Sequence, residues 1–158
     1  MRILGIDPGY AIVGFGVLDY NGFEFTPVEY GAVTTEAGTE FYQRLRIIHE
    51  DIEFIFDKFK PDYVAVERLF FTTNQKTAID VAQARGVVML SAAIRNIPIA
   101  EYTPLQVKMS VVGYGKAEKR QVMEMTRQIL KFENIPKPDD AADALAIAIC
   151  HGHTIRFL

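Results

Sequence analysis

Apolar residues recur with strand and helix periods along the first half of the chain. A short apolar run over residues 3–6 ends at Pro8-Gly9 and predicts a first strand. Alternating apolar positions over residues 12–20 and 23–33 predict two further strands. Asn21-Gly22 lies between them and is a strong hairpin signal. The chain is therefore expected to begin with three antiparallel strands.

The following segment changes from a period of two to a helical period. Between residues 41 and 59, six apolar residues are spaced alternately by four and three positions, with charged residues between them. This pattern predicts an amphipathic helix that covers one face of the sheet. The six residues are Phe41, Leu45, Ile48, Ile52, Ile55 and Phe59.

The second half of the chain alternates strands and helices. Strands are expected at 63–67 and 98–102, and helices at 74–96, 104–112, 117–131 and 139–151. Strand-crossover-strand units after a hairpin predict an α/β fold, a mixed five-stranded sheet with helices on both faces. The helix over 74–96 is apolar on more than one side, which suggests that it also meets a partner.

Composition fits one soluble domain over residues 1–158. The chain is 49% hydrophobic, enough for a full core, and its longest uncharged apolar runs are shorter than a membrane span of ~20 residues. Met1 is followed directly by strand residues, so no targeting segment is expected. The single cysteine, Cys150, excludes an internal disulfide and fits a reducing compartment. We expect a cytoplasmic protein.

Four acids occupy the ends of predicted buried elements. Asp7 and Glu67 end the first and fourth strands, and Asp140 and Asp143 share one face near the start of the last helix. Each has an ordinary explanation, because Asp caps turns and acids are favoured in the first turn of a helix. Together they indicate a metal site at the carboxyl ends of the strands, where ligands of such sheets collect.

Oxygen-only ligands suit Mg²⁺ or Mn²⁺. Two such ions ~4 Å apart would activate a water and stabilise the leaving oxygen of a phosphodiester displacement.

We interpret Asp139 as a helix cap. His151 is too far along the helix to join the site, and we expect both His151 and His153 at the end of the helix, where cations are favoured.

Net charge alone argues against a nucleic-acid partner, since the formal charge is −3 and the pI about 5.6. Two bound divalent ions would make the net charge slightly positive.

Four basic residues gather after the fifth strand and could contact phosphates or form a solvated face. They are Lys108, Lys116, Lys119 and Arg120.

Two aromatic residues follow Glu67. Phe70 and Phe71 could belong to the core, or one could stack on an unpaired base.

An ordered set of short motifs resembles the RuvC crossover-junction endodeoxyribonucleases along nearly the whole chain. The matching motifs are Gly5-Ile6-Asp7-Pro8-Gly9, Val64-Ala65-Val66-Glu67 with Phe70, Gln83-Ala84-Arg85-Gly86, Gln106-Val107-Lys108, Val111-Val112-Gly113, Ala117-Glu118-Lys119 and Asp140-Ala141-Ala142-Asp143-Ala144-Leu145-Ala146.

The resemblance implies a ribonuclease-H-like fold and a homodimer that nicks Holliday junctions symmetrically during homologous recombination and DNA repair. It implies dependence on Mg²⁺, two ions per active site with Mn²⁺ as a substitute, and a RuvA-RuvB branch-migration complex as partner. It gives the four acids as the catalytic metal ligands, Phe70 as the base-stacking residue, and Lys108 and Lys119 as DNA contacts.

Two other classes share parts of these patterns. Actin-like kinases and chaperone ATPases begin with a similar Gly-Ile-Asp strand, but they need a second nucleotide-binding lobe for which 158 residues leave no room. A related nuclease acting on RNA, or an inactive nucleic-acid-binding module, stays open. Loss of one of the four acids would favour the inactive module, and all four are present.

Overall fold

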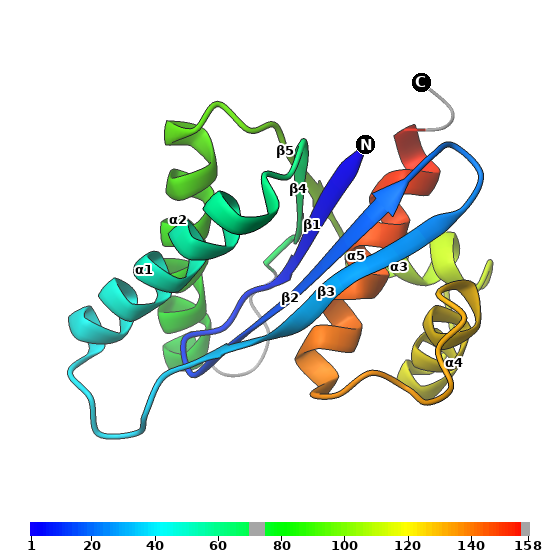
Figure 1. Ribbon diagram of the computed structural model, residues 1–158. Helices are drawn as coiled ribbons and strands as arrows, with labels where there is room; N and C mark the ends of the chain where they lie inside the picture. The colour runs from blue at the N-terminus through cyan, green and yellow to red at the C-terminus, as the bar shows by residue number, and fades with distance from the viewer. Residues whose placement is uncertain (70–74, 156–158) are drawn as a thin grey trace.

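Five strands form one mixed sheet in the computed structural model, which describes residues 1–69 and 75–155. The strand order is β3-β2-β1-β4-β5 (Figure 1). The first three strands are antiparallel, and β4 and β5 continue the sheet in parallel with β1. This confirms the predicted mixed sheet. The strands are β1 (Arg2–Asp7), β2 (Ile12–Tyr20), β3 (Phe25–Thr34), β4 (Tyr63–Glu67) and β5 (Ile99–Tyr102).

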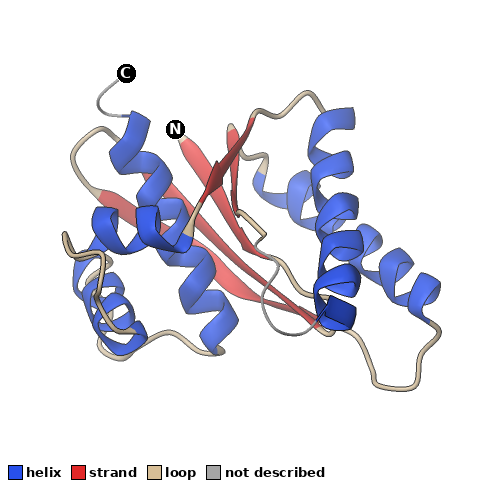
Figure 2. Ribbon diagram, turned by 180° about the vertical axis from the view of Figure 1, so that it is seen from behind, coloured by secondary structure: helices blue, strands red, loops and turns tan. Residues whose placement is uncertain are grey.

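Helices cover both faces of the sheet, as predicted. Figure 2 shows the sheet from behind, between two groups of helices. The pair α1 (Phe41–Phe59) and α2 (Gln75–Ile94) covers one face. The other face carries α3 (Pro104–Val111), α4 (Lys119–Ile129) and α5 (Asp139–Ile155). The expected boundaries agree with these within two residues, except that α5 continues to Ile155.

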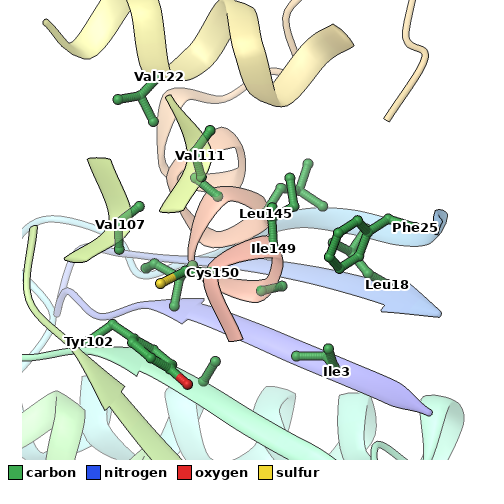
Figure 3. Packing of buried hydrophobic residues seen from close by; sticks show 14 of the residues in the cluster. Ile3, Leu18, Phe25, Tyr102, Val107, Val111, Val122, Leu145, Ile149 and Cys150 are labelled. Atoms are coloured by element: carbon green, nitrogen blue, oxygen red, sulfur yellow. The ribbon is translucent and has the colours of Figure 1, made fainter. Parts of the chain in front are cut away.

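Successive side chains of β1 point alternately into two separate hydrophobic cores. Leu4 and Ile6 are fully buried in the cluster beneath α1 and α2, whereas Ile3 belongs to the cluster beneath α5. Figure 3 shows Leu145 and Ile149 of α5 above the strands that carry Ile3 and Leu18. Since side chains alternate along a strand, Asp7 faces the same side as Ile3. The pattern of the strand therefore directs this carboxylate toward α5.

Glycines on the strands allow α5 to lie directly on the sheet. A Cβ at Gly5 would clash with the backbone carbonyl of Ala144, and a Cβ at Gly14 with the carbonyl of Asp140. At Gly16 the clash would be with the side chain and backbone of Leu145. Because glycine has no side chain, the helix backbone approaches β1 and β2 more closely than any other residue would permit.

The helix α2 carries apolar residues on buried and exposed faces, as its sequence suggested. Ala84, Val88 and Ala92 are buried against the sheet and α1, while Leu90 and Ile94 are 61% and 67% exposed. The segment Lys76–Ile94 is long and apolar enough to span a membrane by length and composition alone. Its buried face instead contributes to the core of this domain.

Two expectations about α5 were wrong. His151 is buried in the core, and this burial lowers its pKa to about 4, so its ring is neutral and not the cation expected at a helix end. Its Nδ1 lies 2.7 Å from the hydroxyl of Tyr102. Asp139 is the first residue of α5, and its carboxylate pairs with Lys137 at 2.9 Å instead of capping the helix.

Candidate active site

Asp7 and Glu67 end neighbouring parallel strands. The register pairs Gly5 with Ala65 and Ile6 with Val66, so one further step along both strands places Asp7 beside Glu67. Ala65 is in the cluster beneath α5, and Glu67, two residues on, faces the same side. The two carboxylates therefore meet at one end of the sheet, as the sequence predicted.

The helix α5 brings the other two acids to this end. In the antiparallel ladder Asp7 lies opposite Gly14, and the backbone of Asp140 is packed directly over Gly14. Asp143 follows one turn later on the same helical face. The close approach that glycine permits thus places the start of α5 next to Asp7.

The protonation equilibria show that the acids share one electrostatic environment. Burial raises the pKa of Asp7 to about 8, and the charges of Asp143, Glu67 and Asp140 add to this effect. The pKa of Glu67 is also raised, first by burial and then by Asp143. Negative charge at this end of the sheet is therefore poorly compensated, which is the setting that a bound cation relieves.

Lys119 partly compensates that charge. Its Nζ lies 3.0 Å from Asp143 Oδ2 at the first turn of α4. Burial lowers the pKa of Lys119, but the hydrogen bond to Asp143 and the charges of Asp143, Asp139 and Asp7 raise it overall. Burial raises the pKa of Asp143 despite the opposing effect of Lys119. The lysine is thus a counter-ion of the acids as well as a candidate phosphate contact.

A cavity of about 290 Å³ opens beside the acids. Its charged lining consists of Glu67, Asp143, Lys108 and Lys119, and its apolar wall comes from α3, α4 and α5. The structure therefore joins two of the four acids and two of the predicted cations in one cavity.

The other predicted DNA contacts lie elsewhere. Arg120 lines a separate hollow with Glu118 and Glu124, and Lys116 is exposed in the loop before α4. Phe70 and Phe71 lie outside the described residues. A role for these four side chains in DNA binding stays a prediction.

Comparison with known proteins identifies the family. The family model for the crossover junction endodeoxyribonuclease RuvC matches residues 3–151. The chain belongs to the RuvC family. It is 54% identical to the RuvC of Ruminiclostridium cellulolyticum, covering 99% of this chain and 94% of that protein. It is likewise 54% identical to the RuvC of Finegoldia magna, covering 100% and 98%.

A solved RuvC structure has nearly the same fold. The Thermus thermophilus RuvC in complex with a Holliday junction substrate superposes with a TM-score of 0.95 at 35% identity, covering 99% of this chain and 96% of that one. The agreement confirms the ribonuclease-H-like fold. It also shows that the family resemblance of the sequence motifs extends to the whole domain.

The four acids of this RuvC-family chain have the right donor chemistry for a hard divalent ion. They supply carboxylate oxygens only, and the raised pKa values of Asp7, Glu67 and Asp143 show a need for positive charge. Among residues 1–69 and 75–155, no three Asp, Glu, His or Cys side chains are already arranged closely enough to enclose an ion. The acids thus interact electrostatically without forming a coordination shell in this part of the chain.

Sequence reasoning gave no role to an arginine that contacts the site. Arg85 of α2 donates from Nε to the backbone carbonyl of Glu67 at 3.2 Å. The available signal was its place in the motif Gln83-Ala84-Arg85-Gly86. Periodicity alone treats such a residue as one charge on a helix.

Proposed function

We propose that this chain is a metal-dependent endodeoxyribonuclease that resolves Holliday junctions by nicking two strands symmetrically during recombination and repair. The observation that carries the proposal is the gathering of Asp7, Glu67, Asp140 and Asp143 at one end of the sheet in a RuvC-family fold. A relative of the same fold is in complex with a Holliday junction substrate.

The four acids would hold two Mg²⁺ ions, with Mn²⁺ able to replace them. Bound ions of this kind activate a water and stabilise the leaving oxygen of the phosphodiester. The chain's own contribution is to hold four carboxylates on rigid elements. Since the pKa of Asp7 is about 8 in the metal-free protein, cation binding must displace its proton near neutral pH.

Lys108 and Lys119 would orient the scissile strand. Both line the cavity beside Glu67 and Asp143, so a phosphate that enters the cavity meets two ammonium groups. Once metal ions neutralise the acids, Lys119 would release Asp143 and bind a phosphate instead. Lys116 and Arg120 lie farther out and would contact the arms of the junction.

Phe70 would stack on a base near the crossover, as the family resemblance implies. It follows Glu67 by three residues in the chain. Stacking of an aromatic side chain on a base contributes about 1–3 kcal/mol, so Phe70→Ala should impair junction processing more than general DNA binding.

A homodimer would supply the two active sites that symmetric nicking needs. The exposed apolar side chains Ile79, Leu90 and Ile94 on α2 offer a self-complementary surface for a two-fold interface. The RuvA-RuvB branch-migration complex would be a further partner. The chain would act in the cytoplasm, where the thiol of its buried Cys150 stays reduced.

The decisive test compares wild type with Asp7→Asn on four-way DNA junctions, linear duplex and RNA/DNA hybrids. Wild type should cleave only the junction, and only with Mg²⁺ or Mn²⁺. The variant should bind the junction but leave it intact, because a lost carboxylate disables the ions and not the basic contacts. Cleavage by Asp7→Asn at the wild-type rate, or a preference for the hybrid, would refute the proposal.

A further inference from the structure

A partly buried arginine links α2 to the strand ends that carry the site. The guanidinium of Arg85 donates from Nε to the carbonyl oxygen of Glu67 at 3.2 Å and from Nη2 to Glu101 Oε2 at 2.8 Å. Its side chain is only 14% exposed. One planar group thus bridges the last residue of β4 and the third residue of β5.

Arg68 reinforces this bridge. Glu101 also faces the guanidinium of Arg68, with Nε at 3.7 Å, and the backbone N–H of Arg68 donates to the carbonyl of Tyr102 at 2.7 Å. Charge-assisted bonds from a rigid fork fix orientation better than bonds from a flexible ammonium. The backbone at Glu67 and Arg68 is therefore held in place.

This location matters because Glu67 is the last residue of its strand. Strand ends fray when their carbonyls lack a partner, and a small rotation there would turn the carboxylate away from Asp143. The Arg85 contact supplies that partner. Arg85 also lies on the helix that presents the exposed apolar side chains Leu90 and Ile94.

We infer that Arg85 is a positioning residue for the metal site, and that it does this by fixing the carbonyl of Glu67 through a bridge shared with Glu101. This inference rests on the proposed function and adds to it a residue that touches neither metal nor DNA. Residues that orient metal ligands typically contribute on the order of 10- to 100-fold to metal affinity.

The test is an electron paramagnetic resonance titration of Mn²⁺ into the full chain at pH 8, with melting temperature and junction affinity in EDTA measured beside it. Arg85→Gln should weaken Mn²⁺ binding on the order of 10-fold or more. Arg85→Lys keeps the charge but offers one ammonium for two acceptors, so it should give a smaller loss in the same direction. Junction affinity in EDTA should stay within about twofold of wild type, because the phosphate contacts are unchanged.

Arg95→Gln is the matched control. Arg95 follows α2 and pairs with Glu53 at 2.5 Å and Asp57 at 2.8 Å, so its loss also removes ion pairs, but they lie on α1. This variant should lower the melting temperature without changing Mn²⁺ affinity. If Arg85→Gln is too unstable to titrate, Arg85→Lys decides. Wild-type Mn²⁺ affinity in folded Arg85 variants would overturn the inference.

Asp7→Asn distinguishes a failure of the positioning role of Arg85 from a failure of the proposed metal site. If Asp7→Asn loses Mn²⁺ binding while the Arg85 variants keep it, only the role of Arg85 fails. If Asp7→Asn binds Mn²⁺ as wild type does, the metal site itself is misplaced and the proposed function fails first.

Discussion

The two faces of the sheet are packed in different ways. Beneath α1 and α2, branched side chains such as Leu4, Ile6 and Ile52 fill the space between helix and strand. Beneath α5, Gly5 and Gly14 bring the helix backbone into contact with the strands. The first face is a conventional hydrophobic core, and the second adds close contacts of backbones to its own hydrophobic cluster.

The four candidate metal ligands lie on the close-packed face. Asp7 and Glu67 point toward α5, and α5 itself supplies Asp140 and Asp143. A thick layer of side chains would hold the helix farther from the strands and separate these carboxylates. Small residues therefore determine the geometry of the site, while large residues on both faces provide stability.

The largest expected effect comes from adding one methyl group to the close-packed face. Gly14→Ala should destabilise the protein by roughly 3 kcal/mol and abolish Mn²⁺ binding, because its Cβ would strike the backbone of Asp140. Gly86→Ala is the control on the other face, since Gly86 lies in α2 and a Cβ added there would meet open space. It should stabilise the chain by about 0.5–1 kcal/mol. Urea unfolding and Mn²⁺ titration measure both, and equal effects of the two variants would contradict the comparison.

A stabilising substitution should be found within the site itself. Because burial raises the pKa of Asp7 from 3.8 to about 8, the folded state binds this proton more tightly than the unfolded state. Metal-free stability therefore falls as pH rises from about 4 to about 8. Asp7→Asn should unfold about 4 °C or more above wild type in EDTA at pH 8.5, with no gain at pH 4. Calorimetry showing an unchanged or lower melting temperature at pH 8.5 would count against this charge distribution.

The same shift gives the metal affinity a pH dependence. A cation competes with the proton of Asp7, so Mn²⁺ affinity should fall on the order of 10-fold between pH 8.5 and pH 6.5. Titrations in two buffers of different ionisation enthalpy would also detect the released proton. A flat affinity over this range would mean that Asp7 is already ionised without metal.

The smallest effect is expected from the conventional core. Ile52→Val removes one methylene beneath α1 and should cost about 0.5–1.5 kcal/mol. Mn²⁺ affinity and junction cleavage of the folded variant should equal those of wild type. A marked loss of metal binding would show that the two faces are coupled through the sheet.

The faces also differ in how far the sequence predicts them. Periodicity places α1 at residues 41–59, as observed, because apolar residues spaced alternately by four and three positions are typical of an amphipathic helix. The hairpin at Asn21-Gly22 and the five strands follow from similar local patterns. The four acids were predicted as metal ligands from their places at the ends of two strands and at the start of the last helix, and the family motifs include the same residues.

The contacts across the sheet were not predictable from such local patterns. Gly5 and Gly14 could be turn or strand glycines in sequence, and only the position of α5 shows that backbone carbonyls occupy the space of their missing side chains. Arg85 is one charge of a helix until Glu67 and Glu101 lie beside it. The burial of His151 depends on the whole fold, so the sequence alone did not predict that its pKa is lowered and its ring neutral.

The most direct test of the account counts the Mn²⁺ ions bound to the chain on a cleavage-resistant four-way junction. Wild type should bind two ions per chain. Asp7→Asn, Glu67→Gln, Asp140→Asn and Asp143→Asn should each lose at least one ion or weaken both while still binding the junction, since the acids from both strands and from α5 form one site. If any of the four variants binds the same number of ions with wild-type affinity, that acid is not a ligand and the convergence of strands and helix on one metal site is wrong.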